Sequence, residues 1–198
     1  MPALQTGDVI FMDNMLFGHF GMAVSTTHFV HANDKSNLHI SSNDSYDPNL
    51  TVQKPAVSMD PRNRVFRPPW GSMTDIQAQT RKDELVRVAN AMIPGAKYGA
   101  YRAIRVFAGA SGFGPDAYKR FMKYRERYEA NKGTPANFAI AGNEVVKTLT
   151  CTEAVIIMYQ LTCPLQERPF WMNLDAAHTM PRDFRDWLRP NGWSQITD

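Results

Sequence analysis

Short apolar runs separated by polar turns occupy the first third of the chain. Residues 7–12, 19–24 and 28–32 combine β-branched, aromatic and other apolar side chains, and turn-forming residues bound each run. A similar run at residues 64–67 stops at two consecutive prolines, which cannot continue a ladder of backbone hydrogen bonds. This pattern predicts four short strands.

Four later segments, one of them at residues 98–107, have the features of helices. Residues 74–92 repeat apolar positions at the helical spacing until a Pro-Gly pair ends the repeat. Thr150 is a favourable N-cap for a helix that begins at Cys151, and residues 180–184 begin a short helix that ends near Leu188. One of these predicted helices therefore has a cysteine in its first turn.

Two segments fit neither pattern. Residues 33–55 are rich in Asn, Asp, Ser and Pro, which predicts a long irregular loop. Residues 108–142 contain a glycine-rich break, a polar-aromatic helical stretch and a loose tail, and we interpret them as a lid or insertion over the site. The total length favours one domain, so we interpret residues 1–198 as a single domain.

The net charge and the hydropathy of the chain indicate which kinds of binding partner are unexpected. The chain has 22 Lys and Arg against 19 Asp and Glu, a net charge of +3, and no strongly basic run. This balance does not indicate a nucleic-acid partner. No apolar run reaches the length of a membrane span, and the N-terminus does not resemble a cleaved signal. We therefore expect no membrane span and no signal peptide.

The two cysteines have different surroundings in the sequence. A continuous helix over residues 152–161 would hold Cys151 and Cys163 about 18 Å apart, whereas a disulfide needs Cα atoms within about 7 Å. We therefore expect two free thiols, with Cys163 buried and inert. Cys151 lies in a first helical turn, where unpaired amides and the helix dipole favour a thiolate, so it is the candidate nucleophile.

Two histidines lie in the first predicted hairpin. If Val24 pairs with His28 through the turn at residues 25–27, then His31 lies opposite Gly21. Strand alternation places His19, Gly21 and His31 on one face. Gly21 would leave room between the two imidazoles, so that His31 could hydrogen-bond His19 and fix its tautomer.

The other histidines have plainer interpretations. His28 falls on the opposite face next to the turn, His39 lies in the polar segment, and His178 has no identifiable partner in the sequence. A zinc site built from His19, His28 and His31 is the alternative, because histidine is a common zinc ligand. Strand alternation separates His28 from the other two, and no Cys-x-x-Cys or His-Glu-x-x-His pattern is present. We expect no metal and no other cofactor.

These motifs resemble those of a known family. Gly-Asp-Val-Ile-Phe at residues 7–11, Gly-His-Phe-Gly-Met-Ala-Val at residues 18–24 and Phe-Val-His-Ala at residues 29–32 are similar to the histidine segment of NlpC/P60 cysteine peptidases. The cysteine follows the histidines here, as it does in the permuted, YiiX-like branch of that family. Residues 64–67, 95–99 and 180–184 are also similar to that branch.

The resemblance implies both a fold and an activity. The fold is α+β, the papain-like NlpC/P60 fold in circularly permuted order, with an antiparallel sheet packed against the cysteine-bearing helix. The activity is that of a cysteine peptidase or amidase that forms an acyl-enzyme. Cys151 would be the nucleophile and His19 the base, His31 would orient His19, and the backbone N–H of Cys151 would help hold the oxyanion.

The resemblance also suggests substrates and a setting. Peptidoglycan stem peptides are the expected substrate, for a protein that is cytoplasmic in its producer and exported by a specialised secretion system to the periplasm of a target cell. Such an antibacterial effector would have an immunity protein or a secretion adaptor as partner. Two alternatives stay open: a lipid-directed thioesterase or acyltransferase, with aromatic residues near 107–121 lining an acyl groove, and a non-catalytic binding module on the same fold.

Overall fold

The computed structural model describes residues 3–13, 18–32, 38–42, 60, 62–99, 112–168 and 170–196. The strands are β1 (Val9–Met12), β2 (His19–Ala23), β3 (His28–Ala32), β4 (Leu38–Ser42), β5 (Asn63–Arg67), β6 (Lys97–Tyr98), β7 (Thr148–Leu149) and β8 (Ser194–Gln195). The α-helices are α1 (Asp75–Met92), α3 (Pro115–Asn131), α4 (Cys151–Thr162) and α5 (Pro181–Leu188). The four strands and the helices predicted at residues 74–92, 151–161 and 180–188 are therefore confirmed. The helix predicted over residues 98–107 is wrong at its start, because Tyr98 lies in β6, and residues 100–107 lie outside the described residues.

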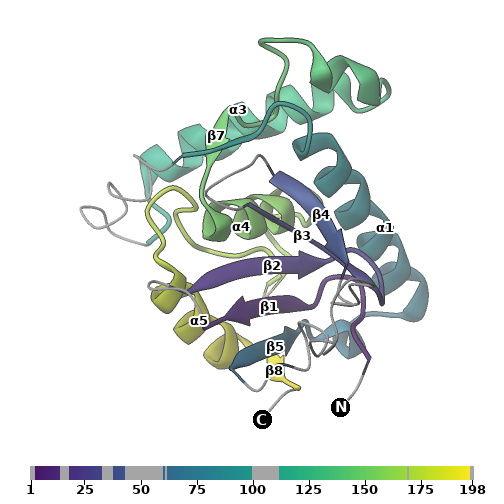
Figure 1. Cartoon of the computed structure of the whole chain (residues 1–198), viewed down its shortest axis with the longest axis vertical. Helices are drawn as coiled ribbons and strands as arrows, with labels where there is room; N and C mark the ends of the chain where they lie inside the picture. The colour runs from purple at the N-terminus through teal and green to yellow at the C-terminus, as the bar shows by residue number, and fades with distance from the viewer. Residues whose placement is uncertain are drawn as a thin grey trace, which may run out of the picture.

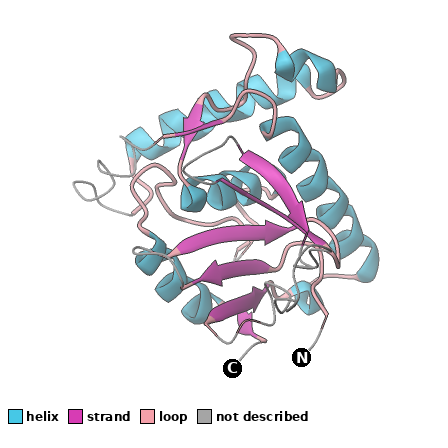
Figure 2. Cartoon of the chain, in the orientation of Figure 1, coloured by secondary structure: helices cyan, strands magenta, loops and turns pink. Residues whose placement is uncertain are grey.

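Six of the strands form one antiparallel sheet (Figures 1 and 2), in the order β4-β3-β2-β1-β5-β8. The short strands β6 and β7 form a separate parallel pair. The fold is thus mixed α+β with an antiparallel sheet. Within the described part of the chain, no helix is long and apolar enough to cross a membrane.

The first hairpin has the predicted register. Gly21 lies opposite His31, and the Val24 N–H donates to the His28 carbonyl over 2.9 Å. His19, Gly21 and His31 therefore share one face of the sheet. This register depends on the turn length, because a shift of one residue would put the two imidazoles on opposite faces of the sheet.

The prediction of an irregular loop over residues 33–55 is wrong in part. Residues 38–42 form β4, which pairs with β3 along its whole length. Leu38 is buried in the main core, and the polar residues between it and the end of the strand hid the alternation. The rest of that segment, residues 33–37 and 43–55, lies outside the described residues.

The two faces of the sheet contact different cores. Phe20 and Met22 point from β2 into the main core, which also contains residues of α1, α3, α4 and α5. Ala23 points the other way, into a smaller cluster that includes Ile10 and Phe29. α4 packs against β2 and β3, with α1 and α3 on its other sides, so nearly every one of its side chains is buried.

The segment expected to form a lid contains a helix packed into the main core. α3 buries Tyr124 and Tyr128 among the core residues and contacts α4. Residues 108–111 lie outside the described residues. A role of residues 108–142 as a lid, and the interpretation of the chain as a single domain, stay predictions.

Candidate active site

The start of α4 holds Cys151 in a defined position. The Thr150 hydroxyl accepts a hydrogen bond from the Glu153 N–H over 3.2 Å, and the Glu153 carboxylate accepts one from the Thr150 N–H over 3.3 Å. This reciprocal capping box satisfies two amides that the helix cannot pair internally. Cys151 is the first residue of the helix and is only 5% exposed.

The surroundings of the Cys151 sulfur act on its pKa in opposite directions. Burial raises the pKa, while hydrogen bonds from the backbone amides of Phe20, Thr152 and Cys151 itself, together with the Thr152 hydroxyl 3.9 Å from Sγ, lower it. Burial dominates, so the pKa lies above the ordinary thiol value. The expectation that the helix start would lower the pKa is therefore wrong, because the sequence shows the helix start but not how deeply the fold buries it.

The hydrogen bond from the Phe20 amide to the Cys151 sulfur joins the start of α4 to β2. The amide that reaches the Cys151 sulfur belongs to Phe20, the residue directly after His19. His19 is the first residue of β2 and is 5% exposed, and its Cα is about 3.8 Å from that of Phe20. Because alternate residues face opposite sides, the His19 imidazole and the Phe20 ring leave the strand in opposite directions. The start of α4 thus lies against the backbone of β2 at the residue that follows His19.

The predicted hydrogen bond between the two histidines is confirmed. His19 Nε2 lies 2.9 Å from His31 Nδ1, and the two rings meet edge to face. His31 Nε2 lies 2.9 Å from the Ser41 hydroxyl. A line of polar side chains therefore crosses one face of the sheet from β2 through β3 to β4.

Ser41 is a candidate site residue that the sequence did not reveal. It lies in the segment expected to be a loop, but the pairing of Phe29 with Ser41 places it diagonally across from His31. The offset is the same as that between His31 and His19. Alternation of Leu38 and Ile40 was the available signal, since it would have predicted β4 and put Ser41 on the histidine face.

Gly21 has a different neighbour from the one expected. A Cβ at this position would lie 2.8 Å from the Phe29 ring and 3.2 Å from the Val30 carbonyl oxygen. The Phe29 ring in turn lies 5.0 Å from the His31 ring. The missing side chain therefore admits Phe29, which packs on the His31 imidazole.

The remaining candidate residues lie in other surroundings. His28 is exposed and bonds the Thr27 hydroxyl over 2.9 Å, on the strand face opposite His31. Both cysteines are free, as expected, and burial raises the pKa of Cys163 to about 12. The side chain of His39 lies outside the described residues. Within the described ranges, no three His, Cys, Asp or Glu side chains come together as metal ligands would.

His178 does have a partner, contrary to expectation. Its Nδ1 lies 2.8 Å from the Asp175 carboxylate. Three of the aromatic residues considered for an acyl groove are described. The ring centroids of Phe113 and Trp171 lie 4.7 Å apart in an edge-to-face arrangement. Phe121 is buried, and Tyr118 is 46% exposed. Phe107 lies outside the described residues.

Comparisons with known proteins give no independent assignment. No family model matches the chain, no curated protein matches it, and no solved structure matches it.

Proposed function

We propose that this chain is a cysteine hydrolase of the permuted NlpC/P60, papain-like kind, in which Cys151, His19 and His31 form the catalytic triad. The observation that carries the proposal is the hydrogen-bonded line His19–His31–Ser41, which ends at the residue next to the amide that contacts the Cys151 sulfur. A nucleophile, a base and a group that orients the base are the parts that such a site requires.

The hydrogen bonds define a consistent set of tautomers. If His31 donates from Nε2 to Ser41, its Nδ1 accepts from His19 Nε2–H. A neutral His19 then has its basic lone pair on Nδ1, the nitrogen that His31 does not use. In this tautomer His19 can take the thiol proton of Cys151.

The raised pKa of Cys151 determines the order of events. At neutral pH the cysteine rests as a neutral thiol, so His19 removes its proton as the sulfur attacks the substrate carbonyl. The Cys151 N–H, at the start of α4, helps hold the oxyanion. His19 then gives its proton to the leaving amine, and a water molecule, deprotonated by His19, cleaves the acyl-enzyme and restores the thiol.

We propose peptidoglycan stem peptides as the substrate, on the basis of the family resemblance. In this setting the protein acts as an antibacterial effector, delivered by a specialised secretion system and restrained in its producer by an immunity protein.

Release of stem-peptide fragments from purified sacculi tests the proposal. Wild type should release new fragments, while Cys151→Ala and His19→Ala should release none. Cys163→Ala is the matched control, because it removes the other buried thiol, and it should retain activity. Equal release by wild type and Cys151→Ala would contradict the proposal. A panel of fluorogenic acyl esters separates a peptide hydrolase from a lipid-directed enzyme, since only the latter should prefer long acyl chains.

A further inference from the structure

A second polar cluster joins α3 to the segment before α5. The Asp175 carboxylate accepts hydrogen bonds from Arg120 Nη2 over 2.5 Å, from His178 Nδ1 over 2.8 Å and from the Ala177 N–H over 3.1 Å. Its side chain is only 8% exposed. A buried carboxylate with three donors holds the Arg120 and His178 side chains in fixed orientations.

Both Arg120 and His178 keep hydrogen-bonding capacity for a ligand. The side chains of Arg120 and His178 are 31% and 34% exposed. Among the described residues, Arg120 Nη1 and His178 Nε2 have no hydrogen-bond partner. His178 Nδ1–H donates its hydrogen bond to the Asp175 carboxylate. The other ring nitrogen, Nε2, is therefore an acceptor when the ring is neutral and a donor when the ring is charged.

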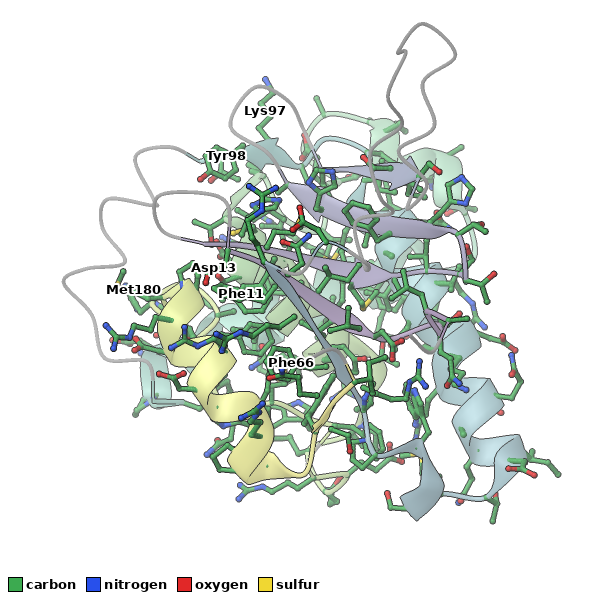
Figure 3. All side chains as sticks on the ribbon, turned by 60° about the horizontal axis from the view of Figure 1, so that its bottom comes forward. Phe11, Asp13, Phe66, Lys97, Tyr98 and Met180 are labelled. Carbon is green, nitrogen blue, oxygen red and sulfur yellow. The ribbon has the colours of Figure 1, made fainter. Side chains whose placement is uncertain are left out.

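The cluster lies on the flank of the candidate active site. α5 packs against the sheet beside Cys151, because the Phe184 ring lies 4.7 Å from the ring of Phe20. Figure 1 shows the segment before α5 reaching the end of the sheet at which β2 begins. Figure 3 shows Met180, the N-cap of α5, near Asp13 at the end of β1.

Chain geometry limits the distance between His178 and Phe184, the residue of α5 that packs on Phe20. One helical turn, about 5.4 Å, separates Phe184 from Met180, and two further residues span at most about 7 Å. The His178 Cα is therefore within about 12 Å of the Phe184 Cα.

We infer that Arg120 and His178 form a subsite that binds a carboxylate of the substrate, on the flank of the site at which the bond is cleaved. The inference rests on the proposed function, since it places the bond at Cys151. The open donor of Arg120 suits a carboxylate oxygen, and His178 Nε2 adds a second donor when its ring is protonated. Asp175 acts as the positioning residue of the subsite.

Peptide binding to the catalytically inactive Cys151→Ala protein tests this inference without requiring cleavage. The probes are a stem tetrapeptide with free carboxylates and the same peptide with these groups converted to carboxamides, titrated calorimetrically. The carboxylate peptide should bind about tenfold more tightly, as expected for one hydrogen bond to a charged group. In the same background, His178→Ala and Arg120→Gln should each abolish the difference between the two peptides.

His28→Ala is the matched control, because His28 is an exposed histidine bonded to a neighbouring hydroxyl. It should retain the preference for the carboxylate peptide. Thermal melting of each variant establishes that it is folded, and His178→Ala provides the test if Arg120→Gln unfolds. Equal binding of the two peptides, no binding of either, or an unchanged preference in folded His178→Ala would overturn the inference. Failure of Cys151-dependent cleavage alone would contradict only the proposed function.

Discussion

His31 Nδ1 lies 2.9 Å from His19 Nε2, on the strand next to that of His19 and two residues out of register with it. The diagonal offset allows the two rings to meet edge to face at 5.1 Å. Because the contact uses Nε2 of His19, the nitrogen assigned to the cysteine in the proposed mechanism is Nδ1. The orientation of the base thus depends on the pairing of β2 with β3.

Removal of the His31 or the Ser41 side chain should lower kcat, and the loss should be larger for His31, which bonds His19 directly. His31→Ala leaves His19 without an orienting partner, and we expect kcat to fall by about 10²-fold, within the range of general acid–base contributions. Ser41→Ala removes the hydroxyl that bonds His31 Nε2, and we expect a loss of about 10-fold. Steady-state kinetics on a stem-peptide substrate measures both. Ser42→Ala, on the opposite face of β4, is the control and should keep its kcat.

The Cys151 thiol should show no acidic titration in the free protein. Burial raises its pKa above the ordinary value of 9.0, so the thiolate fraction, and with it the rate of alkylation by iodoacetamide, should increase with pH through neutrality and beyond. Mass spectrometry of Cys163→Ser protein isolates the rate at Cys151. A rate that reaches its plateau below pH 7 would indicate a thiolate–imidazolium pair at rest and would contradict this expectation.

The hairpin could be predicted because its signals are local. Alternating apolar residues and a turn of fixed length determine its register, and the register alone puts both imidazoles on one face. The helix start at Cys151 is equally local, since the Thr150 cap and Glu153 lie within one turn.

Other features depend on contacts distant in sequence. Arg120 and Asp175 are 55 residues apart, and no spacing rule connects them. The burial that raises the pKa of Cys151 comes from the packing of α4 between the sheet and two other helices. β4 escaped prediction for another reason: only Leu38 and Ile40 are apolar in it, and Ile40 is exposed.

The capping box of α4 should affect both stability and activity. Thr150→Ala removes the acceptor for the Glu153 N–H, and we expect it to lower the free energy of unfolding by about 1 kcal/mol. Thr74→Ala is the matched control, because Thr74 and Gln77 form the same motif at the start of α1. Urea unfolding should show similar losses for both variants. Only Thr150→Ala should also reduce kcat, since Cys151 follows it directly; equal kcat values would contradict a link between the cap and the nucleophile.

The ion pair of Asp8 with Arg67, at the start of β1, should make the stability of the protein depend on pH. Asp8 is fully buried, and Arg67 donates to both of its carboxylate oxygens over 3.0 and 2.8 Å. Burial raises the pKa of Asp8 above its ordinary 3.8, and Arg67 opposes that increase. The folded state therefore holds this proton more tightly than the unfolded state, so the stability contributed by Asp8 falls as pH rises from about 4 through the raised pKa.

Arg67→Met should increase this dependence on pH. Without the guanidinium, the buried Asp8 carboxylate keeps only the weaker attraction of Lys82, and its pKa rises further. At pH 7 we expect a loss of about 3 kcal/mol in the free energy of unfolding, because one partner of a buried pair has been removed. Protonation of Asp8 should reduce the loss as pH falls, although the lost bond from Arg67 to the Ala3 carbonyl keeps it above zero. Urea unfolding at pH 7 and pH 4.5 measures both values.

Arg62→Met is the control, because it breaks the exposed pair with Asp60 and should change stability little at either pH. A loss of the same size at both pH values for Arg67→Met would show that Asp8 does not titrate in this range.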